Sequence, residues 1–160
     1  MYDAKEMTWP YIAGFFDGEG SISFRFSNSR GHRCLNVCAR IGQNVEHSFV
    51  LDEIIEFLQS KGVSHVTDSI TTNNGFSNKQ FRVIAISGRE NVRIFLKGIV
   101  PYLIVKAPKA YRVLSFLEEE RQIRNRRGID AARNFIQVEG ERMMEGLESL
   151  LREASNAPAE

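Results

Sequence analysis

The stretch of sequence that decides the fold is Tyr11-Ile12-Ala13-Gly14-Phe15-Phe16-Asp17-Gly18-Glu19-Gly20. Just before it, Thr8 is a favourable N-cap residue and Pro10 is tolerated in the first turn of a helix. These residues predict a helix that begins near Thr8 and runs to about Asp17. The glycine-rich segment that follows, from Gly18 to Gly20, is expected to end it.

Small residues lie on one side of this predicted helix. Gly14 and Gly18 are four residues apart, and Ala13 lies beside Gly14. Residues of this size and spacing allow a second helix to approach closely. Glycine destabilises a helix by about 1 kcal/mol relative to alanine, and close packing would offset that penalty. We therefore expect a helix to pack here, and the same helix of a second subunit is one candidate.

Two acids stand at the end of the predicted helix. Asp17 and Glu19 lie at the negative end of the helix dipole, where each is destabilising by about 0.3–1 kcal/mol. Residues that break local rules are candidates for function. If two such helices pair, two Glu19 carboxylates meet and repel unless a cation separates them. Mg²⁺ suits such a site, and phosphodiester hydrolysis is the chemistry it would serve. The alternative is an ordinary helix that ends in a glycine turn.

Strand patterns follow on the C-terminal side. Ile22, Phe24 and Phe26 alternate with polar residues, as do Leu35, Val37, Ala39 and Ile41, which predicts a hairpin. An amphipathic helix is predicted over residues 46–60, with Phe49, Val50, Ile54, Phe57 and Leu58 on its core side. A second pair of strands is predicted over about 63–72 and 78–87. Its apolar side is expected to carry Phe81, Val83 and Ala85, and its polar side Asn78, Gln80 and Arg82.

Helices are predicted for the rest of the chain, over residues 89–97, from Pro108 to about Gln122, and over 129–153. A basic linker is expected at 124–128. The predicted fold is α+β, an antiparallel sheet with helices on one face and a polar, arginine-bearing opposite face. Residues 1–122 are expected to form the core domain, and residues 123–160 a C-terminal helical extension of it with a frayed tail.

The composition supports one compact domain. The chain has 160 residues and a net charge of +1, but residues 20–45 contain four arginines and no acid. An acid-free stretch in a near-neutral protein suggests a face shaped for a polyanion. No apolar run is long enough for a membrane span, and the N-terminal residues lack the apolar region of a secretory signal. We expect a protein that is not secreted, in the cytoplasm of a prokaryotic host or in an organelle.

The stretch from Ile12 to Gly20, followed by Ser21-Ile22, resembles the LAGLIDADG motif of homing endonucleases. The predicted order over residues 8–122 is similar to the αββαββα core of that family, whose antiparallel sheet forms a DNA-binding saddle. Only one copy of the motif is found, and in this family such chains act as homodimers on roughly palindromic DNA. The resemblance therefore implies an intron-encoded, site-specific endonuclease that makes double-strand breaks in a long pseudo-palindromic site.

The resemblance also implies roles for individual residues. Glu19 corresponds to the catalytic, metal-binding acid, and Gly18 to a residue whose carbonyl can bind the metal, Mg²⁺ or Mn²⁺. Gln43 and Lys106 correspond to further catalytic positions, whereas His47 departs from the basic residue that some members have. The expected dimer interface comprises Ile12, Ala13, Gly14, Phe16 and Asp17.

The polar face of the sheet is expected to lie in the major groove, where strands can reach base edges. The candidate DNA-binding residues are Arg25, Ser27, Asn28, Arg30, His32, Arg33, Asn36, Arg40, Thr71, Asn73, Asn74, Lys79, Gln80 and Arg82. The arginines at 124–127 are expected to contact phosphates, which position a protein without specifying sequence. Two alternatives stay open: a maturase that binds intron RNA, and a catalytically inactive DNA-binding regulator on the same fold.

Overall fold

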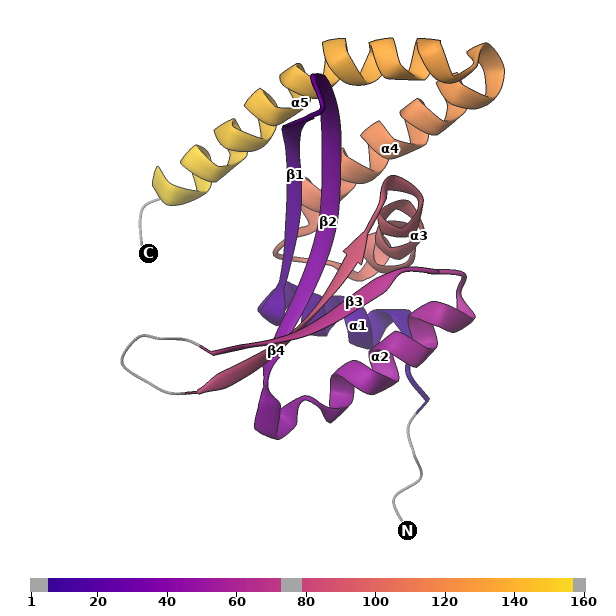
Figure 1. The fold of residues 1–160 in the computed structure, drawn as a ribbon. Helices are drawn as coiled ribbons and strands as arrows, with labels where there is room; N and C mark the ends of the chain where they lie inside the picture. Colours follow the sequence, from indigo (N-terminus) through magenta and orange to yellow (C-terminus); the bar gives the residue numbers. More distant parts are fainter. Residues whose placement is uncertain (1–5, 73–78, 157–160) are drawn as a thin grey trace.

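A computed structural model describes residues 6–72 and 79–156 of the chain. The elements in order are α1 (Trp9–Glu19), β1 (Gly20–Ser29), β2 (His32–Asn44), η1 (Val45–His47), α2 (Phe49–Ser60), β3 (Val66–Thr72), β4 (Gln80–Ser87), α3 (Arg89–Ile99), η2 (Val100–Tyr102), α4 (Ala107–Arg127) and α5 (Ile129–Asn156). The four strands form one antiparallel sheet in the order β1-β2-β4-β3. The predicted α+β class is confirmed, and Figure 1 shows the long β1–β2 hairpin rising from the crossing β3–β4 pair.

All the helices contribute to a single core on one face of the sheet. From the strands this core receives Ile22 and Phe24 of β1, Val37, Ala39 and Ile41 of β2, and Ile84 and Ile86 of β4. We call this the helix-covered face and the other the open face. The predicted alternation of apolar and polar residues along β1 and β2 is confirmed, because the apolar residues of these strands face the core. Within the described residues, no helix combines the length and apolar character that a bilayer span requires.

The motif helix ends two residues later than predicted. α1 continues to Glu19, and the N–H of Gly20 donates to the carbonyl of Phe16. A Cβ at Gly20 would lie 2.2–2.5 Å from the Phe16 ring, so only glycine allows the chain to turn from the helix directly into β1 at this point. Glu19 therefore occupies the last position of the helix.

The predicted face of β4 was wrong. Ile84 pairs with Ile41 and Ile86 pairs with Ala39, and both isoleucines are fully buried. Phe81, Val83 and Ala85 consequently lie on the open face. Since the stretch Val83–Ile86 is apolar at every position, alternation in the sequence could not distinguish the two faces.

The buried face of α2 differs from the prediction in the first turn of the helix. Phe49 was expected in the core but is 71% exposed, whereas Leu51 is fully buried beside Val50, Ile54 and Leu58. A separate 3-10 turn, η1, precedes the helix, so that α2 begins at Phe49 and not at residue 46. The first helical residue thus lies to one side of the buried stripe.

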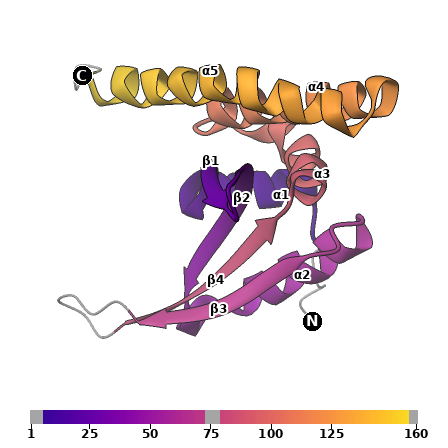
Figure 2. The ribbon, with the colours of Figure 1, turned by 45° about the horizontal axis from the view of Figure 1, so that its top comes forward.

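The predicted basic linker at 124–128 was also wrong. α4 continues to Arg127, and Gly128, with φ +86°, makes the break before α5. The boundary expected at residue 122 therefore falls inside a helix. α5 packs against α4 and crosses the helix-covered side of the β1–β2 hairpin (Figure 2). Here the Gln137 side chain donates to the carbonyl of Arg33 at 3.1 Å.

Candidate metal and nucleic-acid site

The C-terminal end of α1 is held by the loop that precedes α4. The Asp17 carboxylate accepts hydrogen bonds from the backbone N–H of Ile104 at 2.7 Å and of Lys106 at 2.9 Å. The ammonium of Lys106 in turn donates to the carbonyl of Asp17. Lys106 therefore lies at the end of the motif helix, bonded to Asp17 although 89 residues separate them in sequence.

Asp17 is ionised by this arrangement. Its partial burial alone would raise its pKa, but the N–H groups of Ile104, Lys106 and Val105, together with the charge of Lys106, outweigh burial. The net effect holds the pKa of Asp17 below its usual value. Asp17 was expected in the dimer interface, but in the structure its carboxylate positions a loop of its own chain.

Gln43 lies at the same end of the sheet. Gly20 pairs with Ile41, so Gln43 extends two residues beyond this pair, at the end of the sheet where α1 leads into β1. Its side-chain oxygen accepts the N–H of Asn44 at 2.8 Å, and it pairs across the sheet with Arg82. His47 is exposed at the end of η1. The structure thus holds Lys106 at the end of α1 and leaves His47 at the surface, and no hydrogen bond among the described residues joins Gln43 to Glu19 or Lys106.

The donors at this end of α1 suit a hard divalent cation. Glu19 is exposed, and the carbonyl groups of the last helical turn carry the negative end of the dipole. Oxygen ligands of this kind are those that Mg²⁺ prefers. No group of three or more His, Cys, Asp or Glu side chains in the described part of the chain could hold a metal. The oxygen atoms at this end of α1 include the exposed Glu19 carboxylate and the backbone carbonyls of the last turn, that of Gly18 among them.

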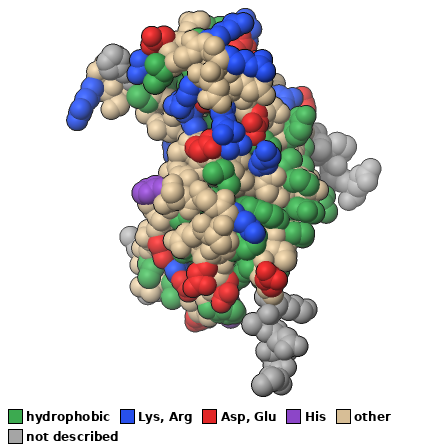
Figure 3. All heavy atoms as spheres, turned by 90° about the vertical axis from the view of Figure 1, so that its right-hand side faces the viewer, with side chains coloured by type: hydrophobic (Ala, Val, Ile, Leu, Met, Phe, Trp, Pro, Cys, Tyr) green, Lys and Arg blue, Asp and Glu red, His purple; other side chains and the backbone are tan. Residues whose placement is uncertain are grey.

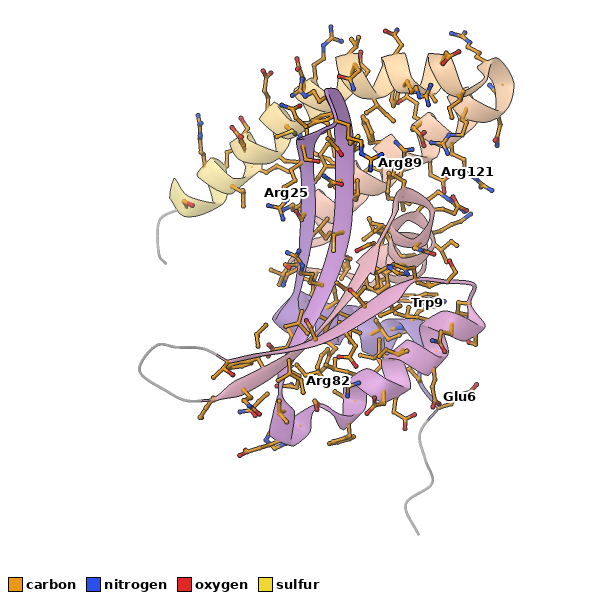
Figure 4. All side chains as sticks on the ribbon, in the orientation of Figure 1. Glu6, Trp9, Arg25, Arg82, Arg89 and Arg121 are labelled. Carbon is orange, nitrogen blue, oxygen red and sulfur yellow. The ribbon has the colours of Figure 1, made fainter. Side chains whose placement is uncertain are left out.

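Arginines on the open face form no ion pair within the described residues. Arg25 of β1 and Arg40 of β2 line a hollow of about 600 Å³ whose edge is formed by Ser87, Gly88 and Arg89. Figure 4 shows Arg25 and Arg89 on either side of the β1–β2 hairpin. Guanidinium groups without carboxylate partners around a hollow form a site for an anion with several charges.

Arginines on the helix-covered face are paired instead. Arg82 donates to Asp68 of β3 at 2.7 Å and to Asp52 of α2 at 2.6 Å, and it lies between the sheet and α2 (Figure 4). These contacts raise its pKa, with the Asp68 hydrogen bond as the main cause. Arg33 packs over the Phe26 ring and pairs with Glu141 of α5. Both residues were expected on the open face, and both instead join elements of the chain to one another.

The other predicted DNA-binding residues divide in the same way. Ser27, Asn36 and Thr71 lie on the open face with Arg25 and Arg40, whereas Asn28 and Gln80 share the helix-covered side with Arg33 and Arg82. Arg30 is exposed in the hairpin turn with φ +50°, and Lys79 is exposed just before β4. Asn73 and Asn74 lie outside the described residues, as does the side chain of His32.

Arg89 was missed by the sequence analysis. It was assigned only to a short helix, and nothing local distinguishes it from other helical arginines. Its position depends on Gly88, whose φ of +91° turns the chain from β4 into α3, and on the pairing of Ser87 with Cys38. Only this long-range register places Arg89 beside the β1–β2 hairpin.

Of the predicted interface residues on α1, Gly14 is exposed and three others are not. Ile12, Ala13 and Phe16 are fully buried in the core of their own chain and cannot contact a second subunit. Gly14 and Gly18, in contrast, are exposed, and a Cβ at either would meet nothing within 4 Å. The i, i+4 glycine stripe is therefore open to solvent.

Apolar residues surround this stripe. Tyr11 of α1 is 52% exposed and stacks on Phe15. Ile104 and Val105, in the loop held by Asp17, are 84% and 73% exposed. Figure 3 shows that hydrophobic side chains gather along one side of the molecule, away from most of the charged groups in that view. Apolar residues at this density beside an open helix stripe are typical of a surface that another protein surface covers.

Comparisons with known proteins identify solved structures that share this fold. No protein-family model matches the sequence, and no curated protein matches it. Among solved structures, the homing endonuclease I-TnaI has a TM-score of 0.56 and 17% identity, over 90% of this chain and 98% of that chain. I-CvuI, solved in complex with an I-CreI target, has a TM-score of 0.55 and 19% identity, over 72% and 68% of the two chains.

The LAGLIDADG homing endonuclease I-GzeII, solved in complex with its DNA target, has a TM-score of 0.59 and 16% identity. The match covers 82% of this chain and 42% of I-GzeII. This chain therefore has the fold of the LAGLIDADG homing endonucleases. The predicted family resemblance is confirmed at the level of the fold, and the motif at residues 12–20 forms the helix α1 that carries Glu19.

Proposed function

We propose that this chain is a site-specific DNA endonuclease that acts as a homodimer and hydrolyses both strands of a long pseudo-palindromic site with Mg²⁺ or Mn²⁺. One observation carries the proposal: Lys106 binds the carbonyl of Asp17 at the end of α1, the helix whose last residue is Glu19, and the open sheet face bears arginines that have no acidic partner among the described residues. A regulator that only binds DNA has no need of such an acid and lysine together.

Double-stranded DNA is the substrate that this surface fits. I-CvuI and I-GzeII, which share the fold, are described as complexes with DNA targets. In this chain, the open face carries Arg25 and Arg40 on strands that can enter the major groove. Arg89 lies beside these strands at the edge of the hollow, where a phosphate would run. Arg33 and Arg82 are left out of the proposed DNA surface because carboxylates of the chain neutralise them.

The homodimer rests on the exposed side of α1. A Cβ at Gly14 or Gly18 would meet no atom of the described residues within 4 Å. Apolar surface is exposed nearby by Tyr11, Ile104 and Val105. Pairing two α1 helices along the glycine stripe would bury this surface and bring the two Glu19 carboxylates together. The chain spans 42% of I-GzeII, so one copy matches less than half of that chain.

The residues at the end of α1 can then act on a phosphodiester. Glu19, with the carbonyl of Gly18, would hold the divalent cation, which supplies Lewis-acid activation of water and stabilises charge at the phosphate. Lys106, fixed by its bond to Asp17, places a positive charge beside the phosphate that is cut, where negative charge develops. Gln43, at the same end of the sheet, would orient water by hydrogen bonding.

The proposal is tested by incubating the purified protein and Mg²⁺ with a randomised duplex library and sequencing both the bound and the cut fractions. One near-palindromic set of duplexes, cut on both strands, is the expected result. Duplexes that are bound but never cut would identify an inactive DNA-binding regulator. Absence of duplex binding, with specific binding of intron RNA, would identify a maturase.

A further inference from the structure

The β4 strand presents an apolar row to the open face. Phe81, Val83 and Ala85 alternate with the buried Ile84 and Ile86, so they share the face that carries Arg25 and Arg40. Phe81 is 37% exposed, and the other two are half-buried between neighbouring strands. Gly42, which pairs with Val83 from β2, adds no side chain to this row.

The neighbouring strand β3 contributes no charge to this area. Thr67, Ser69 and Thr71 donate their hydroxyl groups to the carbonyls of Ala85, Val83 and Phe81, each at 3.4 Å. These hydroxyls are already directed at the β4 backbone. The charged residues of this strand pair, Asp68 and Arg82, lie on the helix-covered face and neutralise each other.

The open face is therefore divided into two regions. Over β1 and β2, Arg25, Arg40 and the adjoining Arg89 line the basic hollow. Over β3 and β4, the described residues present only methyl, methylene and aromatic groups with hydroxyls that are already bonded. A duplex lying along this face would meet guanidinium groups over one part of each half-site and an apolar strip over the other.

In the major groove, base edges also present two kinds of group, hydrogen-bonding atoms and an apolar methyl. Arginine pairs with guanine through two hydrogen bonds, whereas the apolar group exposed there by unmodified DNA is the C5-methyl of thymine. Resting on the DNA-binding function proposed above, we propose that Phe81, Val83 and Ala85 recognise pyrimidine C5-methyl groups. The target half-site then has thymine-rich base pairs beneath β3–β4 and guanines or phosphates beneath Arg25 and Arg40.

The test uses duplexes selected from the randomised library. Thymines in a selected duplex are replaced one at a time by deoxyuridine, which lacks only the methyl group, and affinity is measured at fixed salt. At the positions beneath β4, each replacement is expected to weaken binding about fourfold, the ratio that corresponds to one buried methyl at ~0.8 kcal/mol. At the same positions, 5-methylcytosine is expected to bind more tightly than cytosine, which separates the methyl group from the rest of the base.

Two variants make the assignment specific. Val83→Thr replaces a methyl by a hydroxyl at nearly constant size, and it is expected to reduce the thymine-to-uracil ratio at one pair of symmetric positions towards one. Arg40→Gln is the matched control on the same face: it is expected to weaken binding to all duplexes while keeping that ratio. If selected duplexes bind uracil and thymine equally throughout, the inference is overturned while the endonuclease proposal stands. If no duplex is selected at all, both fail together.

Discussion

Replacing Asp17 by asparagine tests the most specific contact in the site. The carboxylate accepts two backbone N–H groups, from Ile104 at 2.7 Å and from Lys106 at 2.9 Å. Asparagine retains one acceptor oxygen, but its NH₂ group opposes the second N–H donor. Hydrogen bonds to a charged group contribute about 1.5–3 kcal/mol and neutral ones about 1 kcal/mol. Losing one bond and weakening the other should therefore lower the free energy of unfolding by about 2–4 kcal/mol.

The assay is urea unfolding at a fixed protomer concentration, since a dimer gains stability with concentration. The folded chain holds the pKa of Asp17 below its value in the unfolded chain, near 3.8. The stabilisation that the Asp17 carboxylate contributes is therefore fully present above the unfolded pKa, and it is lost as the pH falls through the pKa of the folded chain. The difference between wild type and Asp17→Asn should be full at pH 7 and should shrink below about pH 4.

Glu19→Gln is the matched control for this prediction. Glu19 is an exposed acid two residues away, and its carboxylate makes no hydrogen bond to the described residues, so its replacement should not lower the free energy of unfolding. Removing a charge from the negative end of the helix dipole should instead raise it by about 0.3–1 kcal/mol. The reasoning would be refuted if Asp17→Asn unfolded like wild type at pH 7, or if its deficit were as large at pH 3 as at pH 7.

Three further predictions concern binding, packing and assembly. Arg89→Ala should weaken binding to all duplexes and reduce the slope of log affinity against log salt by about 1, as measured by titration at several salt concentrations. Gly140→Ala should destabilise the chain by about 1–3 kcal/mol in urea unfolding, because the new Cβ would lie 2.4 Å from the Phe26 ring. Gly146→Ala in the same helix should cost nothing, because its Cβ meets only the end of a flexible arginine. Gly14→Leu should give a folded monomer in sedimentation experiments at concentrations where the wild type is a dimer.

Much of the fold follows from local patterns. The helix–hairpin–helix–hairpin order was predicted because periods of 3.6 and 2 are distinct where polar residues interrupt the apolar ones, as in β1 and β2. The same rule failed at β4, where Val83–Ile86 is apolar throughout and only pairing with Ile41 and Ala39 chooses the buried face. The basic segment at 124–128 was predicted as a linker because charge was given more weight than helix propensity.

The candidate site was predicted only in part, because some of its features depend on tertiary packing. Glu19, Lys106 and Gln43 came from the motif and the family resemblance, and of these the structure shows Glu19 as the last residue of α1 and Lys106 bonded to Asp17 beside it in the helix. The position of Arg33 could have been predicted, because it alternates in step with Leu35 and Val37 on the core side of β2. That of Arg82 could not, because the buried face of β4 is chosen by pairing with β2. The ion pairs of the two arginines also form only when Glu141, Asp68 and Asp52 are brought beside them. Partners so distant in the chain are set by tertiary packing alone.

In the proposed function, Glu19 is the acid through which this domain cuts DNA. The most direct test measures binding and Mg²⁺-dependent cleavage of one selected duplex by the wild type and by Glu19→Gln, side by side. We predict that the variant binds the duplex as tightly as the wild type, within about threefold, and cleaves neither strand. A variant that still cuts both strands would contradict it, because the acid at the end of α1 would then not be needed for the reaction.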